Sequence, residues 1–240
     1  IEAIVRAASS IILEAEHQEE QSSLKRNRND LVTVYDVRVQ HYLEEELLSL
    51  LPDAGFLGEE EGADDVAGKA LYYIVDPIDG TTNFVIDYRH SAISVALAGQ
   101  KLEDGEAVGL PEILVGVCYN PYLDEMFTAV RGDGAYLNGE RLQVPERELA
   151  DSVVLFGTAP YFREFADKTF AMAKTLFLRT RDIRRGGAAV LDICYIAAGR
   201  GDLFYELDLS PWDYAAAALI AEEAGAKVTA INGSELTYQT

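Results

Sequence analysis

One stretch of this sequence combines acidic, small and hydroxyl residues in an order suited to binding metal and phosphate. Residues 76–84 read DPIDGTTNF and directly follow the apolar run LYYIV. Asp76 and Asp79 supply carboxylates, which Mg²⁺ prefers as ligands together with water and substrate phosphate. Gly80 has no side chain that would keep a ligand from the backbone, so the N–H groups around Thr81 can cradle an anion. The stretch therefore predicts a site for divalent cations and a phosphate group.

Further carboxylates stand where predicted elements begin or end. Glu59 and Glu60 follow a short apolar segment, and Asp213 stands at a predicted helix start. Each acid has an ordinary explanation when taken alone. Glu59 could be a loop acid, Asp213 could interact with a helix dipole, and Asp79 could cap a helix that begins near residue 81. Taken together, they have the composition of a binuclear metal site, and this joint interpretation is the one we adopt.

The hydrophobic pattern of the first half predicts two helices and a mostly antiparallel sheet. An apolar stripe with helical spacing covers residues 1–21, and a second helix begins at Thr33 or Asp36 and runs to about residue 51. Strands are predicted at 72–75, 91–98, 113–119, 125–130 and 135–137. Because Pro77 discourages continuation of the ladder, the first strand is expected to end before Asp76 and to leave both aspartates in a turn.

Strands alternate with helices after Pro145. The predicted strands are 152–156, 203–205 and 227–230, and the predicted helices are 166–176, 188–198 and 212–224. Such alternation indicates a second sheet with helices packed on it. We expect two halves, an N-terminal α+β half at 1–145 and a C-terminal α/β half at 146–240, that form one cooperative unit around a cleft.

Composition limits the partners that the chain can bind. With 240 residues, of which 49% are hydrophobic, it can build a sizeable core. Its formal net charge of −21 argues against binding to nucleic acid or anionic membranes, although phosphate can bind where metal ions reverse the local charge. We find neither a membrane-spanning run nor a signal-peptide pattern.

Cys118 and Cys194 form no CxxC pair, so we expect buried free thiols in a soluble, cytoplasmic protein.

The order of these motifs resembles the inositol monophosphatase family of Mg²⁺-dependent, Li⁺-sensitive sugar phosphatases. The resemblance is carried by DPIDGTTNF, by GEE at 58–60 and by WDYAAAALIAEEAGA from residue 212, and it spans nearly the whole chain. Lys25 and residues 30–36 (DLVTVYD) are similar to the mobile N-terminal loop of the family and the element that follows it. The implied fold class is α/β (α+β), a layered α-β-α-β-α sandwich of the inositol monophosphatase and fructose-1,6-bisphosphatase type. The resemblance also implies two or three Mg²⁺ ions per site and a homodimer.

The resemblance assigns roles to particular residues. The implied metal ligands are the carboxylates of Glu59, Asp76, Asp79 and Asp213 and the backbone carbonyl of Ile78, with Asp76 bridging two ions. Thr81, oriented by Asp36, is implied to activate the attacking water, and Glu60 and Asp30 are implied to assist. The implied phosphate and substrate contacts are Asp79, the amides of Gly80 and Thr81, Ala189, the loop at 157–158 and Glu206.

Several features leave alternatives open. The D-x-D-G-T string of haloacid-dehalogenase-like phosphatases is not matched, because two residues separate Asp76 from Asp79. Arg184 and Arg185 could recognise an extra phosphate or form ion pairs. Residues 85–91 (VIDYRHS) and Ala188 depart from better-known family members, which affects substrate preference more than metal chemistry. The three histidines lack paired spacing and are interpreted as surface or packing residues; they are His17, His41 and His90.

These observations predict a Mg²⁺-dependent phosphomonoesterase that hydrolyses inositol monophosphate or a related small sugar phosphate through metal-activated water. No protein nucleophile is needed in such a mechanism. The alternatives are a fructose-1,6-bisphosphatase or 3′-phosphonucleotide phosphatase of the same superfamily, or a regulatory binding protein that keeps the fold. Residues 82–84 (TNF) favour the inositol-type branch over nucleotide-directed relatives.

Overall fold

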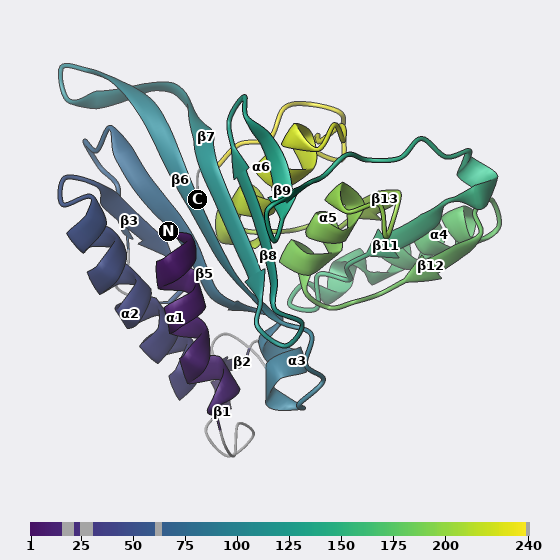
Figure 1. Cartoon of the computed structure of the whole chain (residues 1–240). Helices are drawn as coiled ribbons and strands as arrows, with labels where there is room; N and C mark the ends of the chain where they lie inside the picture. Colours follow the sequence, from purple (N-terminus) through teal and green to yellow (C-terminus); the bar gives the residue numbers. More distant parts are fainter. Residues whose placement is uncertain (16–21, 25–30, 61–63, 239–240) are drawn as a thin grey trace.

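The computed structural model describes residues 1–15, 22–24, 31–60 and 64–238 (Figure 1). Within this part of the chain, eight strands form one large sheet in the order β10-β9-β8-β7-β6-β5-β3-β4. Neighbouring strands are antiparallel except β3 and β5, which are parallel. The strands are β3 (Gly55–Gly58), β4 (Asp64–Asp65), β5 (Leu71–Asp79), β6 (Ala92–Glu103), β7 (Glu106–Asn120), β8 (Glu125–Val130), β9 (Gly134–Leu137) and β10 (Glu140–Arg141).

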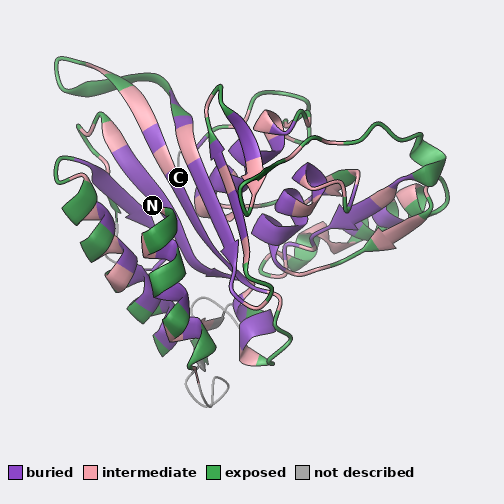
Figure 2. Cartoon of the chain, viewed as in Figure 1, coloured by how far each residue is buried: buried purple, intermediate pink, exposed green. Residues whose placement is uncertain are grey.

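Two helices cover one face of this sheet. Helices α1 (Glu2–Leu13) and α2 (Val34–Leu50) lie side by side and turn their apolar residues toward the strands, while their outer faces are exposed (Figure 2). Leu43 of α2, Tyr73 of β5 and Val95 of β6 belong to the core cluster between these layers. A short antiparallel pair, β1 (Ser22–Leu24) and β2 (Leu31–Thr33), precedes α2.

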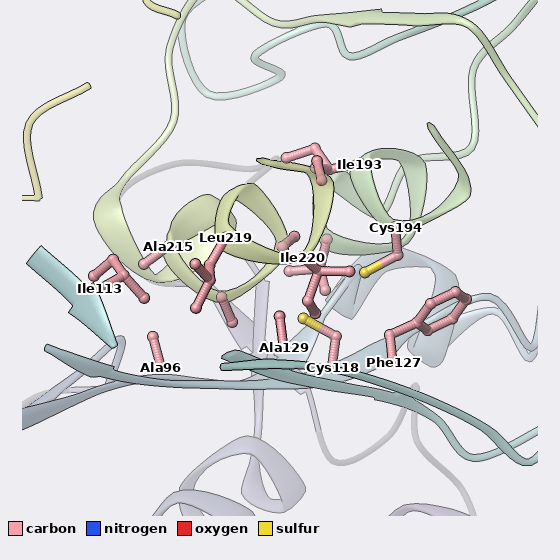
Figure 3. Packing of buried hydrophobic residues seen from close by; sticks show 14 of the residues in the cluster. Ala96, Ile113, Cys118, Phe127, Ala129, Ile193, Cys194, Ala215, Leu219 and Ile220 are labelled. Atoms are coloured by element: carbon pink, nitrogen blue, oxygen red, sulfur yellow. The ribbon is translucent and has the colours of Figure 1, made fainter. Parts of the chain in front are cut away.

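The opposite face of the large sheet is covered by helices from the second half of the chain. Ala215, Leu219 and Ile220 of α6 (Pro211–Glu223) pack over the sheet, beside residues of α5 (Ala189–Ala197) (Figure 3). The contact is close because α6 is rich in alanine and β7 has a glycine there: a Cβ on Gly116 would lie 2.5 Å from the carbonyl oxygen of Ala216.

A smaller sheet lies beyond α5 and carries the last layer. Its described strands are parallel and run in the order β12 (Asp182–Arg184), β11 (Val153–Phe156), β13 (Leu203–Tyr205). Helix α4 (Ala166–Phe177) packs on it through Ala173, next to the short helices η1 (Leu149–Asp151) and η2 (Arg163–Phe165). The layers therefore follow the predicted order α-β-α-β-α, and the predicted fold class is confirmed.

The structure differs from the sequence prediction at several elements. Strand β12 was not predicted, and β6 and β7 are longer than the predicted strands at 91–98 and 113–119. Strand β5 does not end at Val75 but continues to Asp79 through a bulge, so the predicted turn is wrong. Residues 227–230 form no strand; Val228 still packs against the core around α6, but from a segment without regular secondary structure. The first helix ends at Leu13, and residues 16–21 lie outside the described part. No helix among the described residues has both the length and the apolar character to cross a membrane.

Candidate active site

The end of β5 brings two carboxylates to one edge of the large sheet. Asp76 pairs with Ser94 and Asp79 with Ala92 of β6, so the bulge accommodates one extra residue on β5 between these pairs. Pro77 has no N–H to offer the ladder, and the next amide, that of Ile78, donates to Asp76 Oδ1 at 3.0 Å. Asp76 and Asp79 are only 1% and 8% exposed. Pro77 thus bends the strand instead of ending it.

A parallel strand places Glu59 beside this pair. Gly58, the last residue of β3, pairs with Val75, and the two strands run in the same direction, so their carboxyl ends meet at one edge. Glu59 continues the alignment, since its N–H donates to the carbonyl of Val75 at 3.2 Å. Gln40 of α2 fixes the next residue: its side chain accepts from the N–H of Glu60 at 2.8 Å and donates to the carbonyl at 3.2 Å.

The first turn of α6 contributes Asp213. Its carboxylate accepts from the N–H of Ser210 at 2.6 Å and forms a capping box, with Pro211 at the helix start. The hydroxyl of Ser94 donates to the carbonyl of Trp212 at 3.4 Å and ties this turn to β6. Asp213 therefore has the structural role that its position at a helix start indicates, and it also faces the end of β5.

Asp79 does not cap the helix that follows it. The N-cap of α3 (Thr81–Val85) is Gly80, and no side chain caps this helix. The carboxylate of Asp79 instead accepts from two amides of the first turn of α5, Ala189 at 3.2 Å and Val190 at 2.8 Å. The capping interpretation is wrong because the carboxylate of Asp79 lies between the end of β5 and the start of α5. It therefore binds amides that are more than a hundred residues away in the sequence.

Gly80 has no room for a side chain. Its φ is 84°, in the left-handed region, and a Cβ would lie 3.1 Å from both the Ala188 Cβ and the carbonyl oxygen of His90. The backbone of β5 can thus pass close to the segment that leads into α5. Gly80 and Thr81 both line the cavity.

The four carboxylates repel one another. Burial is the largest cause that raises the pKa of Asp76 well above its usual range, followed by the charges of Glu59, Asp79 and Asp213. Burial and acidic neighbours also raise the pKa of Asp79 and of Asp213. Within the described residues, no three acidic, histidine or cysteine side chains are arranged to hold an ion as they stand. Backbone amides donate to the carboxylates of Asp76, Asp79 and Asp213 instead. These side chains would have to change their conformation before they could surround a cation.

A hydroxyl and a buried acid lie next to this group. The Oγ1 of Thr81 is 3.3 Å from Asp36 Oδ1 and 3.2 Å from the carbonyl oxygen of Ile78. Asp36 is held at the start of α2 by Thr33, whose N–H donates to Asp36 Oδ2 at 2.7 Å in a capping box. Burial is the main cause that raises the pKa of Asp36 to about 7, with Glu59 and Glu60 adding to it.

A cavity of about 200 Å³ opens above these residues. Its lining includes Glu59, Asp79 and Asp213, and also Asp192 and Glu206. Burial raises the pKa of Asp192 to about 7 and also raises the pKa of Glu206, while the nearby Arg185 lowers both.

The structure separates the two adjacent arginines. Arg185 lines the cavity and donates to the Oγ1 of Thr158 at 3.2 Å. Arg184 pairs with Asp182 on the exposed edge of the small sheet, 2.5 Å away. Of these two arginines, Arg185 is the one that lines the cavity.

Most of the predicted site residues lie in one place. Glu59, Asp79, Gly80, Thr81, Ala189, Glu206 and Asp213 line the cavity; Asp36, Glu60, Asp76 and Ile78 are buried around it. Asp30 and Lys25 lie outside the described residues, as does His17. Sequence reasoning missed Gln40, which carries no motif, and Asp192, whose signal was a lone acid within the apolar segment that forms α5.

The remaining cysteine and histidine predictions concern packing. Cys118 and Cys194 are buried free thiols, as expected. His41 is exposed near Glu44. His90 packs against Tyr195, with ring centroids 5.8 Å apart, and burial lowers its pKa.

Comparison with known proteins identifies the family of this chain. The sequence matches the inositol monophosphatase family over residues 1–240. It is 41% identical to an inositol-1-monophosphatase of Rhizobium meliloti over 97% of this chain and 84% of that protein. It is 36% identical to the Nus factor SuhB of Vibrio cholerae, again over 97% and 84%. The structure superposes on the IMPase of Thermotoga maritima with a TM-score of 0.84 and 32% identity, over 99% of this chain and 86% of the other. The chain therefore belongs to the inositol monophosphatase family.

Proposed function

We propose that the chain is a Mg²⁺-dependent phosphomonoesterase acting on a small polyol phosphate, with inositol monophosphate as the first candidate. The observation that carries the proposal is the convergence of Glu59, Asp76, Asp79 and Asp213 beside the backbone amides of Gly80 and Thr81. Family membership and the inositol-1-monophosphatase relatives support it. Cytoplasmic location and a homodimer remain expectations from the sequence.

The donor set fits hard divalent cations. All its side-chain donors are carboxylate oxygens, and the charges that act on the pKa of Asp76 come from other acids, Glu59, Asp79, Asp213 and Asp36. Such a buried concentration of negative charge is costly without a compensating cation. We therefore assign these four carboxylates and the carbonyl of Ile78 as Mg²⁺ ligands. When bound, Mg²⁺ neutralises phosphoryl oxygens and supplies Lewis-acid activation of water.

The residues of the chain position the reactants. The amides of Gly80 and Thr81 would hold phosphate oxygens, because the lack of a side chain at residue 80 leaves the backbone accessible. Thr81, held between Asp36 and Ile78, would orient the attacking water and pass its proton to Asp36. Glu60, fixed by Gln40, would assist through a neighbouring water. Glu206 and the backbone near Ala189 would bind substrate hydroxyls.

The charge of the cavity favours a monophosphate over a bisphosphate. Its lining contains six acids and, among the described residues, one cationic side chain, that of Arg185. A second phosphate would meet Asp192, Glu206 and Asp208 without a metal to neutralise it. This argues against fructose 1,6-bisphosphate as the preferred substrate.

Release of inorganic phosphate from a panel of esters tests the proposal. Turnover should require Mg²⁺ and fall on addition of Li⁺, the inhibition that we expect from the family resemblance. A lack of metal-dependent turnover on every ester would contradict the proposed function.

A regulatory role is a second candidate, because several relatives at about 36% identity are named Nus factor SuhB. The variant Asp79→Asn distinguishes the two candidates. In a strain that depends on this chain, a scaffold role should survive the substitution, whereas a role that needs catalysis should not.

A further inference from the structure

Asn83 belongs to the DPIDGTTNF stretch but has no part in the chemistry proposed above. It lies in α3 and is only 5% exposed, so its side chain is turned into the protein. Its Nδ2 donates to the carbonyl of His90 at 2.8 Å and to the carbonyl of Gly186 at 3.1 Å. One amide group therefore joins the segment that follows the phosphate-binding backbone to a segment 103 positions further along the chain.

Gly186 lies in the stretch that joins β12 to α5, residues 185–188, which we call the β12–α5 connection. Several side chains hold this glycine. Asn83 binds its carbonyl, and the carboxylate of Asp192 accepts from its N–H. A Cβ at residue 186 would lie 2.4 Å from Asp192 Oδ1 and 2.9 Å from His90 Nε2, so a larger residue would displace both side chains. The connection is thus fixed through both backbone polar groups of one residue.

The connection also carries Arg185, whose guanidinium folds back over Gly187. A Cβ at residue 187 would lie 2.5 Å from Nη1 of Arg185 and 3.3 Å from Nδ2 of Asn83, so both side chains flank this glycine. The φ of Gly187 is 85°, which glycine adopts without strain. The guanidinium then donates to the Oγ1 of Thr158. Among the described residues that line the cavity, Arg185 alone is cationic.

The connection is less buried than the helix that follows it. Arg185 is exposed and the two glycines are half-buried, whereas Val190 and Leu191 of α5 are fully buried in the core. A displacement of the connection would therefore move the guanidinium but leave α5 in place. The amides of α5 that bind Asp79 would stay in place as well.

We propose that Asn83 is a positioning residue: by holding the β12–α5 connection, it keeps the guanidinium of Arg185 in the cavity, where the positive charge favours binding of the anionic ester. The inference rests on the proposed phosphatase function. In a cavity lined by acids, a single cation lowers the electrostatic cost of admitting a phosphate group. The proposed proton transfer uses Thr81 and Asp36, which lie in other segments. Loss of Asn83 should therefore raise KM and leave kcat little changed.

A double-mutant cycle tests the inference, with hydrolysis of inositol 1-phosphate in the presence of Mg²⁺ as the assay. Leucine has nearly the shape of asparagine but donates no hydrogen bond, so Asn83→Leu should raise KM about fivefold and change kcat less than about twofold. Arg185→Gln should raise KM at least as much. Adding Asn83→Leu to Arg185→Gln should have no further effect, because both substitutions remove the same interaction. Asn232→Leu, at an exposed position, is the control and should match the wild type.

Other results overturn the inference. The KM of Asn83→Leu could equal that of the control, or its effect could persist undiminished when Arg185 is already replaced. In either case Asn83 does not act through the arginine. If Asn83→Leu does not fold, Gly186→Ala takes its place in the cycle with the same expected results, because its Cβ would push against Asp192 at the same connection.

Hydrogen exchange followed by mass spectrometry measures the connection without catalysis. In Asn83→Leu, peptides that cover residues 184–188 should exchange faster than in the wild type, while peptides from α5 should exchange equally in both proteins. Equal exchange at residues 184–188 would reject the inference whatever the activity. If no ester is hydrolysed by any of these proteins, the proposed function fails, and exchange alone decides whether Asn83 holds the connection.

Discussion

At the scale of single residues, Asp79 interacts in two ways. It accepts from the amides of Ala189 and Val190, which join the large sheet to α5, and its charge adds to the repulsion at Asp76. A single carboxylate thus joins the end of β5 to the start of α5 and, in the proposed function, would also supply negative charge for a cation.

Replacing Asp79 by asparagine should remove most of the activity. The variant keeps a carbonyl oxygen for one amide but loses the charge, so kcat/KM should fall by about a hundredfold or more and Mg²⁺ should no longer raise Tm. Phosphate release and thermal melts with and without Mg²⁺ measure both effects. Asp87→Asn, an exposed substitution, is the control and should match the wild type. Activity of Asp79→Asn near that of the control would contradict the assignment.

The buried acids also predict an unusual pH dependence for the metal-free protein. The pKa values of Asp76, Asp79 and Asp213 are raised in the folded state, and those of Asp36 and Asp192 reach about 7. Between their ordinary value of 3.8 and about 7, the folded protein binds more protons than the unfolded chain, so stability falls as pH rises. His90, whose pKa is lowered, acts in the opposite direction, but it is a single group against several carboxyl groups with raised pKa values.

In EDTA, the Tm should therefore be higher at pH 5.5 than at pH 7.5. Mg²⁺ should raise the Tm more at pH 7.5, where the carboxylates are ionised. Thermal denaturation at both pH values, with and without Mg²⁺, measures this. A Tm that increases between pH 5.5 and 7.5 in EDTA would contradict the raised pKa values of these carboxyl groups.

At the scale of elements, α2 supports the loop that carries Glu59 and Glu60. Gln40 is 3% exposed and binds both backbone polar groups of Glu60. Gln40→Leu should leave these groups unsatisfied, at a cost of about 1–3 kcal/mol, and should raise the Mg²⁺ concentration needed for half-maximal activity. Gln143→Leu, at an exposed position, is the control. An unchanged Mg²⁺ requirement in Gln40→Leu would contradict this role.

The position of α6 depends on Gly116 of β7. A valine there would collide with the backbone at Ala216 and push α6, with Asp213, away from β5. Gly116→Val should lower the free energy of unfolding by at least about 1–3 kcal/mol and reduce activity, whereas Ala107→Val, at an exposed position on the same strand, should do neither. Chemical denaturation and phosphate release test this. Full stability of Gly116→Val would contradict the close packing of α6 on β7.

Local sequence patterns predicted the positions of helices and strands better than they predicted which strands pair. Strand β8 has the predicted bounds, and α2 begins after Thr33 as its capping pattern indicates. The bulge at Pro77 was not predictable, because whether a proline ends or bends a strand depends on the neighbouring strand. The parallel pairing of β3 with β5 and the clamp of Gln40 on Glu60 join segments distant in sequence, and no local pattern records them.

At the scale of the whole molecule, the fold brings acidic residues that are distant in sequence close together at one site. The net charge is −21, and the site brings together Glu59 directly after β3, Asp76 and Asp79 of β5, and Asp213 in the first turn of α6. Glu59 and Asp213 are more than a hundred and fifty positions apart, and only the layered arrangement brings them to the same cavity. In the proposed function, divalent cations would supply the positive charge that side chains do not supply at this site.

Crystals soaked with Mn²⁺, which stands in for Mg²⁺ and scatters anomalously, test this claim most directly. We expect anomalous density for at least two ions among Glu59, Asp76, Asp79 and Asp213, with Asp76 touching both. Density that is absent there, or present only at other surface acids, would contradict the account.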